Sequence, residues 1–344
     1  MTASRFVLPA LLAAAALALS GCSASNAGSA GGFGGSAGDL KVVATTTQVA
    51  DLTRNIIGDT PGVTLTQLIQ PNQSAHSYDP SAADLTALGR ADVLVINGVG
   101  LEEWLTDAID ASGFHGVTID SDAGITIAAD AAGNDSAAGN ASTDAAHDHA
   151  GGNPHIWTDV ANAEAMTRTI AAGLATASTA DTGRAAALAA NAAAYDTRLT
   201  ALDSWIRANI DPVPVAERLL VSNHDAFGYF TTAYGITYVG SVIPSFDDNA
   251  EPSASDIDQL VTKIRATGVK AVFSEASISP KAADTIARQA GVTVYSGENA
   301  LYGDSLGPAG SDGATYIASQ VHNVRLILES WGVTPTAVPA DLRE

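Results

Sequence analysis

The sequence predicts an α/β protein of two lobes, each with a parallel β-sheet flanked by helices, joined by a long rigid helix and separated by a ligand-binding cleft. Apolar runs of strand length alternate with helical patterns from residue 41 to residue 119, and the alternation returns from residue 219 to residue 295. Such alternation is typical of parallel sheets. Between the two series lies an alanine-rich helical pattern over residues 181–210. At the α-helical rise it extends roughly 45 Å, long enough to run along both lobes.

The first alternating series defines the N-terminal lobe, residues 40–178. Its strands are expected at residues 42–44, 63–69, 92–97 and 117–119, and its helices at residues 48–57, 81–90, 101–111 and 160–177. Asp79 and Pro80 mark the start of the second of these helices. Residues 121–152, which are rich in Ala, Gly, Asn, Asp and Ser, are expected to form a flexible loop.

The connecting helix, assigned to residues 179–212, ends at the Pro212 and Pro214 pair. The C-terminal lobe, residues 213–344, repeats the order of the first. Its strands are expected at residues 219–222, 236–242, 271–274 and 292–295, and its helices at residues 226–234, 254–267, 280–290 and 314–331. Ligands of such two-lobed proteins bind between the lobes.

The N-terminus predicts a lipid-anchored, extracytoplasmic protein. Residues 1–22 carry Arg5 and then an apolar run that ends just before Cys22, the pattern of a secretory signal with a lipoprotein cleavage site. The run is too short to span a membrane. Cys22 is the only cysteine, which excludes a disulfide framework and makes Cys22 the expected lipidation site. Residues 23–39, mostly Ser, Ala and Gly, are expected to be a flexible linker.

The charge of the chain limits its partners. The formal net charge is −21 over 344 residues, which argues against nucleic acid, because nucleic-acid binding needs clustered Lys and Arg. An acidic surface suits a cationic ligand, but it also serves solubility and selects no ligand by itself. We expect the protein to be a monomer held at the membrane only by its lipid anchor.

Three histidines and one aspartate stand in loops that follow strands or end the first lobe. They are His76, His155, His224 and Asp304. Ligands of open α/β sheets bind at the carboxyl ends of strands, so these four loops are expected to converge in the cleft, two from each lobe. Three imidazoles and one carboxylate complete the coordination of a divalent transition metal such as zinc. The intervals of 79, 69 and 80 residues exclude a local zinc finger.

Pro154 fixes the backbone before His155, and Asp159 is placed to cap the following helix. Each candidate ligand, taken singly, also fits a packing or capping role. Other polar residues have plainer interpretations. Glu275 suits a hydrogen bond to a ligand or a surface position equally well, and His115 and His322 are interpreted as surface or helix-face histidines. Trp157 and Tyr229 are expected in the core.

Several segments together resemble the zinc- and manganese-binding lipoproteins of ABC importers, the ZnuA/TroA-like family. The segments that carry the resemblance are 41–46, 76–80, 97–102, 153–157, 224–230 and 304–306. The resemblance extends from about Leu40 to Trp331. It implies two α/β lobes joined by a rigid helix and ligands at His76, His155, His224 and Asp304. It also implies delivery of the metal to a membrane permease, without catalysis.

The identity of the metal stays open between zinc and manganese. Zinc-specific members of that family often have a long His-rich loop before the second ligand, which is reduced here to His147-Asp148-His149. Manganese members commonly have glutamate at the third ligand position, where this chain has His224. Three imidazoles favour zinc, with manganese as the alternative. We expect His147 and His149 to assist metal capture without forming the tight site.

Two other functions compete with metal delivery. A zinc-dependent hydrolase needs an open coordination position and a general base. Asp304 closes the coordination set, and the chain has no His-Glu-x-x-His helix, which argues against that alternative. A metal-dependent surface adhesin stays open on the sequence alone.

Overall fold

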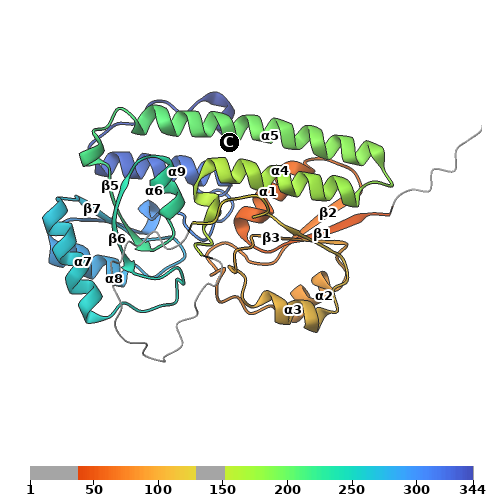
Figure 1. Ribbon diagram of the computed structural model, residues 1–344, viewed down its shortest axis with the longest axis horizontal. Coiled ribbons are helices and arrows are strands. Elements are labelled where there is room, and N and C mark those ends of the chain that lie inside the picture. Colours follow the sequence, from red (N-terminus) through yellow and green to blue (C-terminus); the bar gives the residue numbers. More distant parts are fainter. Residues whose placement is uncertain (1–37, 129–151, 344) are drawn as a thin grey trace, which may run out of the picture. The chain divides into compact units, whose positions relative to one another are not determined.

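The computed structural model describes residues 38–128 and 152–343, all within one compact unit, Gly38–Glu344 (Figure 1). The expected signal segment, the lipidation site Cys22, most of the linker, and the histidines His147 and His149 lie outside the described residues. Among the described helices, none has an apolar stretch long enough to cross a bilayer.

The first lobe contains one parallel sheet in the order β2-β1-β3-β4. The strands are β1 Leu40–Ala44, β2 Val63–Gln67, β3 Val93–Ile96 and β4 Val117–Asp120. Val42 pairs with Leu65 on one side and with Val93 on the other. Val42 and Val93 are buried because helices cover both faces of the sheet, which is why the strands read as continuous apolar runs.

The helices of the first lobe begin where capping side chains are available. They are α1 Thr47–Ile57, α2 Ala82–Leu88, α3 Leu105–Ser112 and α4 Val160–Ala177. Thr46 caps α1 by accepting a hydrogen bond from Val49 N, and Asp159 caps α4, as expected. Ser81 and Asp84 form a capping box at α2, so the helix begins after Ser81 and not at the Asp79-Pro80 pair. Helix α3 begins later than expected, because positive φ angles at residues 98–100 hold the chain in a turn.

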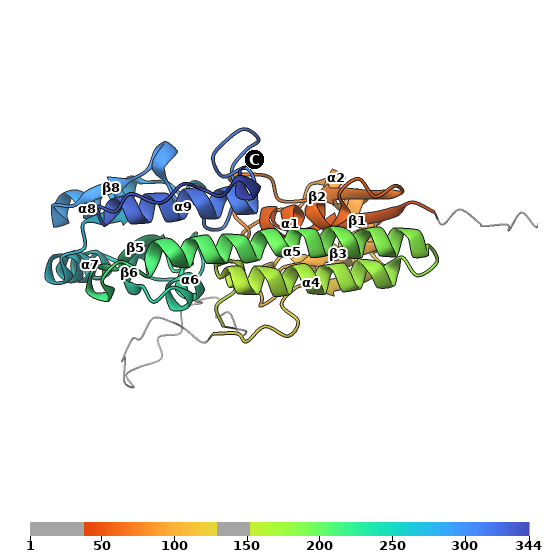
Figure 2. The same ribbon diagram turned by 90° about the horizontal axis from the view of Figure 1, so that it is seen from above.

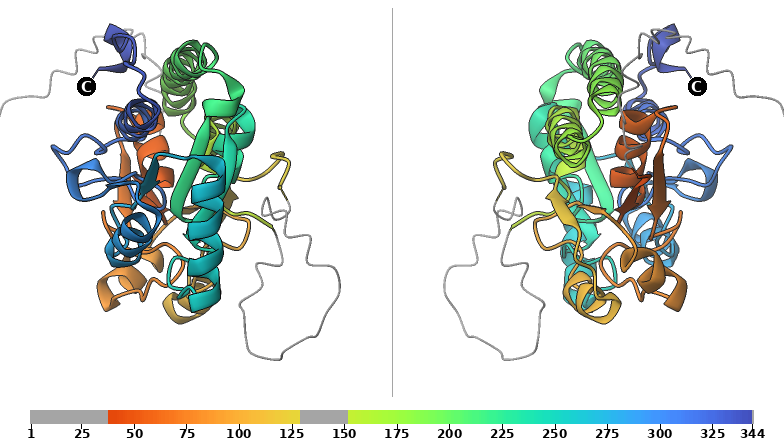
Figure 3. Two further views of the ribbon diagram at one scale, coloured as in Figure 1. Left: turned by 90° about the vertical axis from the view of Figure 1, so that its left-hand side faces the viewer. Right: turned by 90° about the vertical axis from the view of Figure 1, so that its right-hand side faces the viewer.

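The long helix α5, Thr182–Ile210, runs beside α4 and also beside α9, Tyr316–Ser330 (Figure 2). Figure 3 looks along α5, and α4 and α9 each lie beside it. Asn191 ties α5 to the end of α1, because its Nδ2 donates hydrogen bonds to the carbonyls of Ile56 and Ile57 at 3.1 and 3.0 Å. The connection between the lobes is therefore a packed helix and not a free linker.

The second lobe has the expected order, but its strands pair in two parallel ladders. The strands are β5 Leu219–His224, β6 Thr237–Ile243, β7 Ala271–Phe273 and β8 Thr293–Tyr295. β5 pairs with β6 and β7 with β8, while β5 also lies beside β7. The helices are α6 Gly228–Ala233, α7 Ala254–Thr267 and α8 Lys281–Ala290, and short 3₁₀ turns occur at Ile156–Thr158, Val215–Glu217, Gly297–Asn299 and Ala340–Leu342.

Candidate metal centre

His76 lies in the loop between β2 and α2, and two side chains fix the backbone around it. Ser74 Oγ accepts a hydrogen bond from His76 N at 3.2 Å. Trp104 Nε1 donates to the carbonyl of Ala75 at 3.0 Å. The residue is 8% exposed, so His76 is the member of the site closest to solvent.

His155 is held by the residue two positions before it. Asn153 Oδ1 lies 3.0 Å from His155 N and 2.8 Å from His155 Nδ1, and all these groups are buried. An amide oxygen only accepts, so Nδ1 carries the proton and Nε2 presents a lone pair when the ring is neutral. Tyr229 on α6 donates its hydroxyl to Asn153 O at 2.9 Å and braces the segment from the second lobe.

His224 ends β5, and its partner Glu275 follows β7. Glu275 Oε1 lies 2.7 Å from His224 Nδ1 and 3.1 Å from His224 N. The carboxylate fixes a proton on Nδ1, so Nε2 of this ring also presents a lone pair when the ring is neutral. The sequence allowed two interpretations of Glu275, a hydrogen bond to a ligand or a surface position. In the structure Glu275 is buried against His224.

The four predicted residues meet in one buried cluster. Asp304 Oδ2 lies 3.1 Å from His76 Nε2 and 3.0 Å from His224 Nε2, and Asp304 Oδ1 lies 3.2 Å from His155 Nε2. The Nε2 atoms of His155 and His224 are 3.2 Å apart. One ligand atom from each residue lies within 4.8 Å of all the others. Residues more than 200 positions apart in the chain thus present their donor atoms to a single point.

The pKa values of the imidazoles in the cluster are shifted in opposite directions. Complete burial lowers the pKa of His155 to about 4, although Asp304 opposes this. Burial also disfavours charge on His76 and His224, but Asp304 raises the pKa of both, joined at His224 by Glu275. Burial disfavours the charged form of Asp304, yet the neighbouring His224 and His155 hold its pKa well below the usual range. Asp304 is therefore an ionised carboxylate buried among three imidazoles.

The donor set fits a divalent transition metal. Two imidazole lone pairs and a carboxylate that face one another at about 3 Å repel unless a proton or a cation lies between them. Three nitrogen donors and one oxygen donor make the four-coordinate set that zinc takes. Nδ1 of His155 donates to Asn153 and Nδ1 of His224 donates to Glu275, which are the supports that metal-ligating histidines have in proteins.

A hydrogen-bonded link between the lobes borders the site beside His76. Ser74 Oγ donates to Asp248 Oδ1 at 2.7 Å, and Asn249 Nδ2 donates to Ser77 Oγ at 2.9 Å. Burial and the nearby charge of Asp304 raise the pKa of Asp248. Sequence reasoning missed this loop. Residues 247–249 follow β6, so the rule that ligands bind at the carboxyl ends of strands applies to this loop as well.

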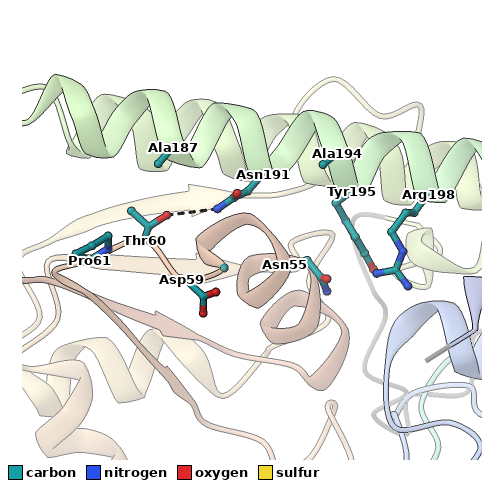
Figure 4. A pocket seen from close by; sticks show the side chains of 10 residues that line it. Asn55, Asp59, Thr60, Pro61, Ala187, Asn191, Ala194, Tyr195 and Arg198 are labelled. Atoms are coloured by element: carbon teal, nitrogen blue, oxygen red, sulfur yellow. Dashed lines mark hydrogen bonds between the residues drawn. The ribbon is translucent and has the colours of Figure 1, made fainter. Parts of the chain in front are cut away.

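A separate cavity of about 430 Å³ lies between α5 and the loop after α1 (Figure 4). Asn191 lines it and donates to Thr60 Oγ1 at 3.3 Å. Asp59 and Arg198 also face this cavity, whereas the histidine cluster does not line it. The metal-ligating candidates pack too closely to enclose such a space.

The remaining histidine predictions divide. His115 is exposed, as expected. His322 lies on α9, so of its two interpretations the helix-face one fits and the surface one does not: the residue is 8% exposed, and its Nε2 lies 2.9 Å from the carbonyl oxygen of Ala300. The core assignments of Trp157 and Tyr229 are confirmed by their burial.

Fold and site together define a class: two-lobed α/β proteins that bind a metal ion between their lobes. The model of the family described as "ZnuA: Zinc-uptake complex component A periplasmic" matches residues 42–330, and the chain belongs to this family. The resemblance found in the sequence is thereby confirmed.

Curated relatives match over most of their length. The manganese-binding lipoprotein MntA of Halalkalibacterium halodurans is 29% identical, with 83% of this chain and 86% of the relative covered. MntA of Bacillus subtilis is 30% identical, with 85% and 89% covered. The zinc-binding protein TroA of Treponema pallidum is 29% identical, with 83% and 87% covered.

Solved structures agree with the fold. The periplasmic zinc-binding protein TroA from Treponema pallidum superposes with a TM-score of 0.72 at 26% identity, covering 86% of this chain and 99% of that one. The Mn-bound periplasmic metal-binding protein of Candidatus Liberibacter asiaticus has a TM-score of 0.70 at 23% identity, covering 85% and 99%. Two parallel-sheet lobes joined by a long helix are therefore the architecture of this chain.

Proposed function

We propose that this protein captures a divalent transition metal outside the cytoplasm and delivers it to the membrane permease of an ABC importer. The family consists of solute-binding components of importers, so the chain is not an enzyme and the hydrolase alternative is wrong. One observation carries the proposal. The Nε2 atoms of His76, His155 and His224 all lie within 3.2 Å of the ionised carboxylate of Asp304, inside a buried cluster.

His76, His155, His224 and Asp304 are the proposed metal ligands. The tautomers of His155 and His224, set by hydrogen bonds at Nδ1, support this assignment, because both rings direct lone pairs to the same point. A bound divalent cation would take the place of the protons in this cluster and contact all four side chains. A bound cation would also account for the burial of an ionised carboxylate among three imidazoles.

Zinc is the proposed cargo, with manganese as the alternative. Three imidazoles and one carboxylate suit zinc, whereas manganese prefers more oxygen ligands. The relatives do not decide the point, since the MntA proteins are named for manganese and TroA for zinc. Affinity alone does not decide it either, because the Irving–Williams order makes most such sites bind zinc more tightly than manganese.

The first test counts metal per chain. Protein purified without added metal is analysed for zinc and manganese, and the metal-free form is titrated with zinc by calorimetry. We expect one tight site, lost in His155→Ala and kept in His115→Ala, a matched change of an exposed histidine. Tight binding that survives in His155→Ala would contradict the ligand assignment.

The second test identifies the cargo in the cell. Deleting the gene should stop growth under zinc limitation, and added zinc should restore it. Replacing His224 by Glu exchanges a nitrogen donor for an oxygen donor and should shift the requirement towards manganese. Rescue of the deletion strain by manganese alone, with cell zinc unaltered, would mean that manganese is the cargo.

Membrane attachment and auxiliary capture belong to the same proposal. Cleavage just before Cys22 and lipidation of Cys22 would leave a monomer tethered by residues 23–39, a role supported by the lipoprotein names of the relatives. Cys22→Ser should release the protein or leave it uncleaved, as judged by membrane fractionation. Deletion of residues 134–150, which contain His147 and His149, should slow capture but leave one tight metal per chain.

A further inference from the structure

Asp304 follows the last strand of the second lobe, yet the residues around it are bonded to the first lobe. The carbonyl of Gly303 accepts hydrogen bonds from Gln48 Nε2 at 2.9 Å and from Trp157 Nε1 at 3.2 Å. Gln48 lies in the first turn of α1, and Trp157 lies two residues after His155. Both donors are 1% exposed. The peptide that precedes Asp304 is therefore anchored on the opposite lobe.

The residues after Asp304 are anchored in the same way. Leu306 N donates to Thr47 Oγ1 at 2.9 Å, and Asn72 N donates to Ser305 Oγ at 2.8 Å. Thr47 neighbours Gln48, so the start of α1 holds the segment on both sides of Asp304. These bonds join positions 233 to 259 residues apart, and Thr47, Ser305 and Leu306 are buried.

The chain changes its partners over a short distance. Up to Leu301 it belongs to the second lobe, because Leu301 N donates to Ser274 O and Ala276 N donates to Leu301 O, each at 2.9 Å. Two residues later, Gly303 is bonded to the first lobe. His224 contrasts with Asp304, since the residue that fixes its ring, Glu275, lies in the second lobe with it.

We propose that Thr47 and Gln48 are positioning residues for Asp304, so that the carboxylate moves with the first lobe and stays beside His76 and His155 when no metal is bound. Three of the four ligands then form a set assembled on one body, and His224 is the ligand supplied by the other. This inference rests on the proposed metal site. The sequence predicted two ligands from each lobe. This proposal revises that expectation, because Asp304 belongs to the second lobe in the sequence but is attached to the first lobe by hydrogen bonds.

The first experiment measures zinc binding in the full-length protein. The double variant Thr47→Ala with Gln48→Ala should bind zinc 10- to 100-fold more weakly, the range seen when supports of metal ligands are removed. Gln259→Ala, an exposed glutamine of α7, is the matched control and should leave the affinity unchanged. Two further changes are made in the Gln48→Ala background. Thr47→Ala should weaken zinc binding further, whereas Thr47→Ser should not, because serine retains the hydroxyl that accepts from Leu306 N.

The visible spectrum of the cobalt-substituted protein reports the ligand set itself. In the double variant we expect a change in the d–d bands, which weaker packing alone does not cause. Unchanged affinity and spectrum would overturn the proposal, as would a Thr47→Ser protein that behaves like Thr47→Ala.

Amide hydrogen exchange tests the proposal without relying on any variant. In the metal-free wild-type protein, the Leu306 amide should keep its protection within tenfold of the zinc-bound value, because its acceptor is Thr47 and not the metal site. A greater loss of protection on metal removal would show that the metal, and not the first lobe, holds the segment. If zinc failed to bind at all, the proposed function would fail, while strong protection of the Leu306 amide in the metal-free protein would still show that the first lobe holds the segment.

Discussion

Glu275 Oε1 accepts two hydrogen bonds from His224, one from Nδ1 at 2.7 Å and one from the backbone N–H at 3.1 Å. Neither side chain is exposed by more than 1%. One carboxylate oxygen therefore sets the ring's orientation and its tautomer together. Because the Nε2 lone pair of the neutral ring is directed at the proposed metal site only in that tautomer, we expect the metal affinity to depend on Glu275, which is not one of the proposed ligands.

Removal of this carboxylate should weaken metal binding without abolishing it. We expect Glu275→Ala to lower the zinc affinity by about 10- to 100-fold, and Glu275→Gln to lower it less, because its amide oxygen still accepts from Nδ1. Competition with a chromophoric chelator measures the change. Glu298→Ala, at an exposed position, is the control. Wild-type affinity in Glu275→Ala would show that packing alone orients His224.

The link between Ser74 and Asp248 should slow metal release. Its hydrogen bond of 2.7 Å joins the lobes next to His76, the proposed ligand closest to solvent. In Asp248→Ala we expect zinc to dissociate several-fold faster into excess chelator, with one site per chain retained. Asp258→Ala, an exposed aspartate on α7 of the same lobe, should behave as wild type. Equal dissociation rates in the two variants would exclude this role.

Asp120, which lies outside the proposed metal site, should make the free energy of unfolding depend on pH. Partial burial and the charge of Asp122 raise the pKa of Asp120 to about 6. A folded pKa above the unfolded value contributes stability that is complete below about pH 4 and is lost as the pH rises through 6. Asp120→Asn removes the repulsion and keeps an oxygen that accepts from Asp122 N.

We therefore expect Asp120→Asn to unfold at higher denaturant concentration than wild type at pH 8, with the difference vanishing near pH 4. Urea titrations of the metal-free protein at both pH values measure it. A difference that is the same at both pH values would mean that the substitution acts through something other than this ionisation.

Much of the fold and all four clustered residues were predictable, because both depend on local patterns. Apolar runs located the strands, and the rule that ligands gather at strand ends led to His76 and His224. Contacts between distant segments carry no such pattern. The bond from Gln48 to Gly303 spans 255 positions, and nothing in the composition around Gln48 indicates it. The burial of His322 was missed for the same reason, since its acceptor, Ala300, lies on a different element.

Zinc should stabilise the folded protein through the site itself. A ligand that binds only the folded state adds about 2.7 kcal/mol when its free concentration is 100 times Kd. For a chain of this size, that is a rise in Tm of several degrees. We expect the rise in wild type and in His115→Ala, and we expect excess chelator to reverse it. His155→Ala should show little rise, because it removes a buried donor from the centre of the cluster. Calorimetric scans with and without zinc measure the effect. An equal rise in His155→Ala would place the stabilising zinc at another site, and a fall in Tm with zinc would show that the unfolded chain binds the metal more tightly than the folded one.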